Sequence, residues 1–129
     1  MAWDFSTDPE FAADLDWVRR FVDEIVMPLD LAGEGLNQRQ LDALWAPFKR
    51  QVKERGLWAA HLPPEHGGCG MGQLRLALLH EVLGRSVLAP EIFGCQAPDS
   101  GNAELLAAGA NAAQARRWLE PLLAGQVRS

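Results

Sequence analysis

The chain has 129 residues, a formal net charge of −5 and 48% hydrophobic residues, values that are typical of one globular domain spanning residues 1–129. The acidic balance excludes a nucleic-acid surface, which needs clustered Lys and Arg, and no apolar run reaches the roughly 18 residues of a membrane span. The first residues show no basic segment followed by an apolar core, so we expect no signal peptide. The two cysteines do not suggest a disulfide framework, and we therefore expect a cytoplasmic protein without a membrane or nucleic-acid partner.

The first periodic segment predicts a helix from Pro9 to Met27, because apolar residues recur there every three or four positions. Either Thr7 or Asp8 can cap its start, since both side chains accept hydrogen bonds from the first turn. Pro28 is expected to end the helix, because proline lacks the N–H that a helix interior requires. A linker is expected to follow over residues 30–36.

Asn37 followed three residues later by Gln40 predicts a capping box at the start of a second helix. Its apolar stripe continues to Gly56, a natural terminator. Pro47 interrupts this stripe. Either the helix kinks at Pro47, or a short helix ends near Trp45 and a new one begins, and the sequence leaves both open.

Residues 63–72 form a loop by composition, with two prolines and four glycines. Glycines before a helix can cradle a phosphate, but this cluster matches neither G-x-G-x-x-G nor the P-loop pattern. A tight chain reversal is therefore the better interpretation. His61, Glu65, His66 and Cys69 lie nearby, but their spacing fits no common zinc signature, so we expect no metal site.

The remaining elements are also predicted to be helical. The helix Leu74–Leu83 is apolar on most sides and is expected to be buried, in part by other chains or domains. Residues 87–94 are compatible with a short helix, and Pro98–Gly109 is a helix rich in small residues. A last helix over 112–123 should place Ala115, Trp118, Leu119 and Leu122 on one side. Without a period-two strand, the predicted fold is all-α, a bundle of roughly five or six helices.

No residue is assigned a catalytic role. Ser100 does not lie in a G-x-S-x-G motif, and neither cysteine has an assigned base. Asp99 is expected to cap the helix that follows Pro98. The small residues between 97 and 108 leave a shallow helix surface that another group could approach closely.

Three stretches resemble one family. Residues 56–72, GLWAAHLPPEHGGCGMG, look like the GL-W-x-x-x-L-P-P-E-x-G-G-x-G turn of acyl-CoA dehydrogenases, and residues 80–86, HEVLGRS, resemble the E-E-L-G-R-S helix end that follows it there. Residues 95–102 and 118–125 look like the last helices of that family's N-terminal domain. The branch most similar to this chain contains the large multidomain acyl-CoA dehydrogenases of long-chain and hydroxyacyl substrates.

The resemblance implies an FAD-dependent oxidoreductase of fatty acid metabolism, which desaturates an acyl-CoA thioester between its α and β carbons. In that family a middle β-domain and a C-terminal helical domain complete the subunit. FAD binds between those two domains of neighbouring subunits, and the catalytic base usually comes from the C-terminal one. The chain stops at Ser129, where the family enters its β-domain, so it is expected to lack the base and to bind FAD weakly or not at all.

The resemblance also carries over a wall of the substrate pocket, although simple helix packing explains the same residues equally well. The implied acyl-lining residues are Gln96, Ala97, Ser100, Gly101 and Glu104. Gln96 could donate to a partner loop. The expected partners are the remaining dehydrogenase domains or a complementary subunit, in a homo- or hetero-oligomer. The alternative is a non-catalytic helical interaction module derived from the family, and an independent enzyme using the glycine loop and His66 ranks last.

Overall fold

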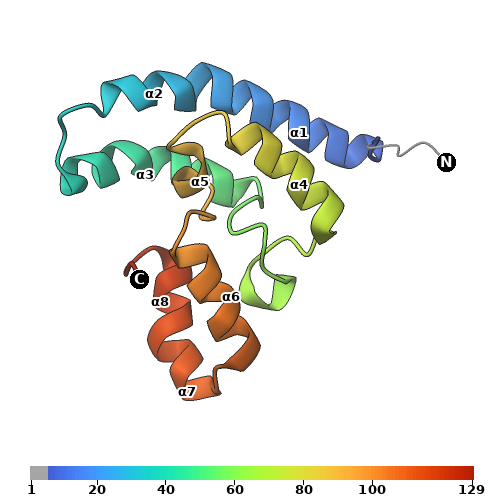
Figure 1. Cartoon of the computed structure of the whole chain (residues 1–129), viewed down its shortest axis with the longest axis vertical. Coiled ribbons are helices and arrows are strands. Elements are labelled where there is room, and N and C mark those ends of the chain that lie inside the picture. Colours follow the sequence, from blue (N-terminus) through green and yellow to red (C-terminus); the bar gives the residue numbers. More distant parts are fainter. Residues whose placement is uncertain (1–5) are drawn as a thin grey trace.

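The computed structural model describes residues 6–129, and this part of the chain contains helices and irregular segments but no strand (Figure 1). The helices are α1 (Pro9–Phe21), α2 (Met27–Ala32), α3 (Gln38–Glu54), α4 (Gly72–Leu83), α5 (Ala89–Ile92), α6 (Asp99–Gly109), α7 (Ala112–Gln114) and α8 (Glu120–Ala124). π-Helical turns over Val22–Val26 and Ala115–Leu119 join α1 to α2 and α7 to α8, and Pro64–His66 forms a 3-10 turn. If helices joined by a π-helical turn are counted as one continuous rod, the described residues form six helical rods. This confirms the all-α prediction.

The two predicted helix starts are present. The Asp8 carboxylate accepts a hydrogen bond from the Phe11 amide at 3.0 Å, so Asp8 rather than Thr7 caps α1. At α3, the Asn37 side chain accepts from the Gln40 amide at 3.1 Å and the Gln40 side chain accepts from the Asn37 amide at 3.0 Å. This reciprocal pair is the predicted capping box.

The two internal prolines behave differently from a simple helix break. α3 runs without interruption through Pro47, so the option of two separate helices is wrong. The expectation that Pro28 ends the first helix is also wrong, because a π-helical turn precedes it and the rod continues to Ala32. In that turn the Met27 amide donates to the Val22 carbonyl, and this wider turn accommodates the proline ring and its missing N–H.

The last rod repeats this arrangement around Pro121. A π-helical turn over Ala115–Leu119 directly precedes α8, whose second residue is Pro121. Its extra residue changes the register of the stripe that was predicted from a regular helical period. Leu119 and Leu122 are buried, but Trp118 is 50% exposed, so the prediction that Trp118 shares one side of the helix with these leucines is wrong.

The helices gather around two hydrophobic clusters. α1 and α2 form one long rod, with α3 and α4 packed beneath it, and α6 to α8 form a second group below (Figure 1). The first cluster lies among α1, α3, α4 and α5, and the second joins α6 and α8 to the segment that follows α3. Trp58 packs against both clusters and therefore connects the two helical groups.

The predicted burial of α4 holds on one side only. Leu79, Val82 and Leu83 are buried against the first cluster, whereas Leu74 is 50% exposed. The described residues therefore leave an apolar part of α4 uncovered. The preceding loop is the predicted tight reversal, because a Cβ atom on Gly68 would lie 1.9 Å from the Leu62 carbonyl oxygen.

Candidate functional site

α6 presents two sides to different surroundings. Within the helix Gly101 and Glu104 are exposed and Ser100 is half-buried, and Ala97 is exposed just before the helix begins. Leu105, one position after Glu104, is 71% exposed. Four of the predicted acyl-lining residues thus lie on an open surface. The fifth, Gln96, lines a hollow that also involves the opposite side of α6.

His61 lies beside the open side of α6. The sequence suggested it only as a metal ligand, a role that its spacing did not support. Burial lowers the pKa of His61, and the nearby His80 lowers it further, whereas the Glu104 carboxylate acts in the opposite direction. Both ring nitrogens are buried without a hydrogen-bond partner. The signal for His61 was its place within the glycine- and proline-rich motif at 56–72, which the resemblance already singled out.

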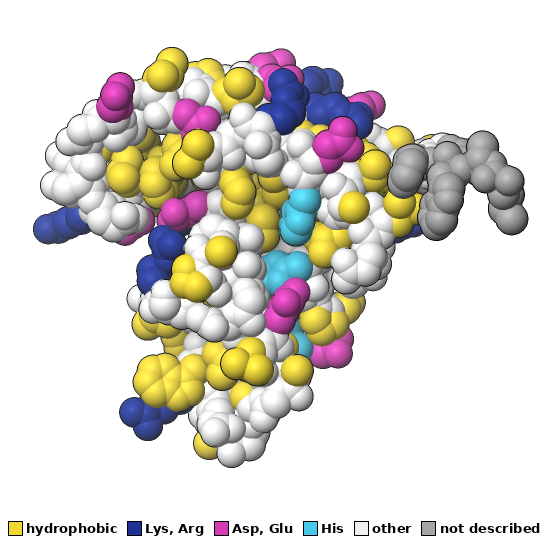
Figure 2. All heavy atoms as spheres, in the orientation of Figure 1, with side chains coloured by type: hydrophobic (Ala, Val, Ile, Leu, Met, Phe, Trp, Pro, Cys, Tyr) yellow, Lys and Arg dark blue, Asp and Glu magenta, His cyan; other side chains and the backbone are white. Residues whose placement is uncertain are grey.

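The face shown in Figure 2 carries histidine side chains near its centre, with hydrophobic and acidic side chains beside them. Little positive charge surrounds this central region in the same view. The open side of α6 thus combines small residues with a few titratable groups, a composition that suits contact with a largely apolar ligand or with another protein surface.

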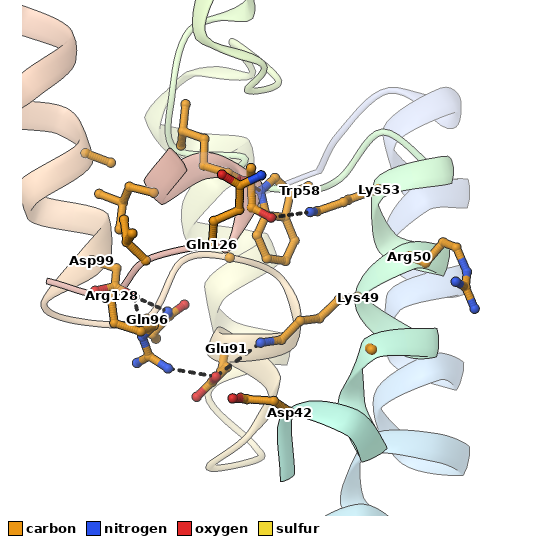
Figure 3. Close-up of a pocket in the computed structure, with 18 of the residues that line it drawn as sticks. Asp42, Lys49, Arg50, Lys53, Trp58, Glu91, Gln96, Asp99, Gln126 and Arg128 are labelled. Carbon is orange, nitrogen blue, oxygen red and sulfur yellow. Dashed lines mark hydrogen bonds and ion pairs between the residues drawn. The ribbon is translucent and has the colours of Figure 1, made fainter. Parts of the chain in front are cut away.

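A hollow of about 570 Å³ lies between α3 and the segment that ends the chain (Figure 3). Lys53 extends into it, 4.3 Å from the Trp58 ring centroid, and its ammonium donates to the Ala124 carbonyl at 3.4 Å. The Trp58 indole N–H donates to the Leu123 carbonyl at 3.0 Å. These contacts tie the end of the last rod to α3.

A row of ion pairs crosses the same hollow. Lys49 on α3 contacts Glu91 on α5 at 3.2 Å, Glu91 contacts Arg128 at 2.9 Å, and Arg128 contacts Asp99 on α6 at 2.6 Å (Figure 3). The hollow is therefore lined by paired charges drawn from three helices and the final residues of the chain. Such a surface differs chemically from the small-residue side of α6.

Asp99 does not cap α6, contrary to the sequence-based expectation. Its carboxylate accepts hydrogen bonds from the Ser129 amide at 2.9 Å, the Ser129 hydroxyl at 2.7 Å and the Gln96 side chain at 2.7 Å, and no side chain caps the helix. Gln96 thus donates within the domain, and its buried Oε1 has no hydrogen-bond partner. Burial by itself raises the pKa of Asp99, but Ser129 and Arg128 together hold it below its ordinary value.

The two cysteines lie in surroundings that disfavour their thiolate forms. Burial raises the pKa of Cys95 to about 12 and also raises that of Cys69, so neither is a ready thiolate at neutral pH. Over residues 6–129 no group of three His, Cys, Asp or Glu side chains is placed to hold a metal ion. None of the helices in this range has the length and apolar character needed to cross a membrane.

Comparison with known proteins identifies the architecture. The model of the family "Acyl-CoA dehydrogenase, N-terminal domain" matches residues 9–126. The chain belongs to this family. The glycine turn, the end of α4 and the last two rods, which carry the resemblance seen in the sequence, all lie within the matched range.

Two curated relatives and one solved structure show how far the similarity extends. It is 38% identical over 122 residues to acyl-CoA dehydrogenase family member 10 of Mus musculus, covering 85% of this chain and 11% of that protein. It is 37% identical over 98 residues to family member 11 of Homo sapiens, covering 72% of this chain and 12% of that protein. A solved chain from Mycobacterium abscessus, assigned to the acyl-CoA dehydrogenases, superposes with a TM-score of 0.80 at 34% identity, covering 95% of this chain and 33% of that one.

Proposed function

We propose that this chain supplies part of the acyl pocket wall of an FAD-dependent acyl-CoA dehydrogenase, which desaturates an acyl-CoA thioester. The observation that supports this role is the open side of α6, where Ala97, Ser100 and Gly101 leave a shallow surface. A Cβ atom on Gly101 would meet no other atom within 4 Å. An alkyl chain could therefore approach the helix backbone closely, as an acyl pocket requires.

The uncovered side of α4 supports the same proposal. Leu74 on α4 and Leu105 on α6 are 50% and 71% exposed, so each element presents an apolar side chain that another protein surface could cover. We propose that the remaining dehydrogenase domains, or a complementary subunit in a homo- or hetero-oligomer, cover them. The chain spans about a tenth of the length of the curated relatives it matches, which leaves ample protein in such relatives for this purpose.

The described residues do not fit FAD. The flat face of Trp58 in the hollow is already covered by Lys53 at 4.3 Å, and its indole N–H donates to Leu123. The ion-pair row that runs from Lys49 through Glu91 and Arg128 to Asp99 also crosses the hollow, so these charged side chains are already engaged. We therefore place the flavin and the catalytic base outside this chain, and we assign no catalytic residue within it.

The alternative function is a non-catalytic helical interaction module derived from the family. The exposed Leu74 and Leu105 are compatible with it, since they could contact a partner that has no dehydrogenase activity. The two functions differ in what a completed protein does. Only the pocket-wall function requires that the assembly containing this chain bind flavin and oxidise acyl-CoA.

The test begins with the isolated chain and ends with a chimera. After incubation with FAD and desalting, the isolated chain should retain no flavin absorption. This chain then replaces the corresponding third of the Mycobacterium abscessus protein, which it matches at a TM-score of 0.80. A chimera that retains stoichiometric flavin and oxidises acyl-CoA supports the pocket-wall role. One that retains flavin but turns over no acyl-CoA favours the interaction module.

A further inference from the structure

We propose that Asp99 is a positioning residue, whose carboxylate attaches the first turn of α6 to residues 128–129. The turn it holds carries the residues that we assign to the acyl wall, so the functional part of this inference rests on the proposed function. The attachment itself is a property of the chain. It can be measured without any substrate.

The contacts of Asp99 converge from two separate parts of the sequence. Its Oδ1 accepts from the Ser129 amide at 2.9 Å and the Ser129 hydroxyl at 2.7 Å, and its Oδ2 accepts from Gln96 at 2.7 Å. The Arg128 Nε lies 2.6 Å from Oδ2. Both oxygens are thus occupied on a residue that is only 7% exposed. A buried carboxylate with this many donors holds its neighbours in one arrangement.

Arg128 extends the attachment to the first group of helices. It also contacts Glu91 on α5 at 2.9 Å, and Glu91 contacts Lys49 on α3 at 3.2 Å. The last residues of the chain are therefore held between α6 and α5. Since α6 belongs to the second hydrophobic cluster and α5 to the first, the ion-pair row fixes how the open side of α6 is presented relative to α3, α4 and α5.

The charge on Asp99 controls this attachment. The charged groups that face it or its partner are Arg128 from the final segment, Glu91 from α5 and Lys49 from α3, while Lys53 lines the same hollow from α3. Arg128 and the Ser129 donors keep the pKa of Asp99 below its ordinary value. The attachment should therefore be complete above the usual carboxyl pKa and should be lost as the pH falls through the lowered folded-state value.

The experiment follows the whole 129-residue chain by NMR, recording the carboxyl carbon of Asp99 and the amides of α6 and Ser129 over an acidic pH range. In the wild type, the α6 first-turn amides should titrate with the same pKa as the Asp99 carboxyl. Arg128→Gln should raise that pKa toward the ordinary range, because it removes the adjacent positive charge. Asp99→Asn should abolish the titration and speed exchange of the Ser129 amide about tenfold or more, the factor typical of a lost charged hydrogen bond.

Asp42→Asn provides the matched control, because Asp42 is an exposed carboxylate that lines the same hollow and bonds Gln38 within α3. It should leave both the α6 titration and the Ser129 exchange unchanged. Asp99→Glu should restore part of the titration. The wild-type titration needs no variant, so a misfolded variant does not prevent the test. An Asp99 pKa that Arg128→Gln does not change, or α6 signals that do not follow it, would overturn the proposal while leaving the pocket-wall function untouched.

Discussion

Replacing Gly68 by alanine should disrupt the turn that carries the family motif. The added Cβ would lie 1.9 Å from the carbonyl oxygen of Leu62 and 2.8 Å from that of Ala59. Both are backbone atoms, so no side-chain rotation relieves the clash and the turn has to open. Overpacking costs about 1–3 kcal/mol and occasionally more, and we expect about 3 kcal/mol or more here because backbone must move. Ala59 and Leu62 would then shift away from the second cluster, which supports α6.

Gly67→Ala is the matched control for this prediction. Gly67 has a φ of +79° and no atom within 4 Å of its Cβ position, so only the left-handed backbone is penalised, at about 1–2 kcal/mol. Urea unfolding followed by circular dichroism gives both changes in the free energy of unfolding on one scale. A Gly68→Ala variant that loses no more stability than Gly67→Ala would refute the reasoning from the close backbone contact.

Three further outcomes are expected. A thiol reagent at mildly alkaline pH should modify Cys95 far more slowly than a free cysteine, because burial raises its pKa to about 12, and rapid labelling of the native chain would contradict this. Burial lowers the pKa of His61, so the unfolded chain binds more protons at this residue than the folded chain does. The free energy of unfolding should therefore fall as the pH drops through the ordinary histidine pKa, and His61→Phe should remove this pH dependence. Phe93→Ala should lower the free energy of unfolding in urea by about 3–5 kcal/mol, because Phe93 is 1% exposed and its ring centroid lies 5.9 Å from that of Phe21. A loss below about 1 kcal/mol would show that the first cluster is loosely packed.

Features that depend on near neighbours in the chain were predictable. Asp8 and the Asn37–Gln40 capping box act over three residues, so the pattern alone contains the interaction. The glycine turn was predictable for the same reason, since a tight reversal needs residues without side chains at fixed local positions. Helix periodicity likewise identified the rods, because their buried faces are set by the spacing of apolar residues.

Features that depend on distant or irregular geometry were missed. Pro28 was expected to end a helix, but a π-helical turn accommodates it. Residue types alone did not predict this turn. A second turn of this kind moved Trp118 to the surface. Asp99 was predicted to cap a helix because it follows Pro98 at the helix start. Its actual partners, Arg128 and Ser129, lie about thirty positions away in the sequence. Only the folded chain brings them together.

The central claim is that the open side of α6 contacts the acyl chain. In the flavin-loaded chimera, Gly101→Leu places a large side chain where the wild type leaves space, since no atom lies within 4 Å of that Cβ position. Asn102→Leu places the same leucine side chain about 100° around the same helix, where the wild type already has a side chain with as many heavy atoms, and serves as the control for added apolar surface. The decisive measurement is the ratio of KM values for a long-chain and a short-chain acyl-CoA. We predict that this ratio rises about tenfold or more in Gly101→Leu, the effect of losing two or three buried methylenes, and stays at the wild-type value in Asn102→Leu. Equal ratios in all three proteins would contradict the assignment of this helix to the acyl pocket.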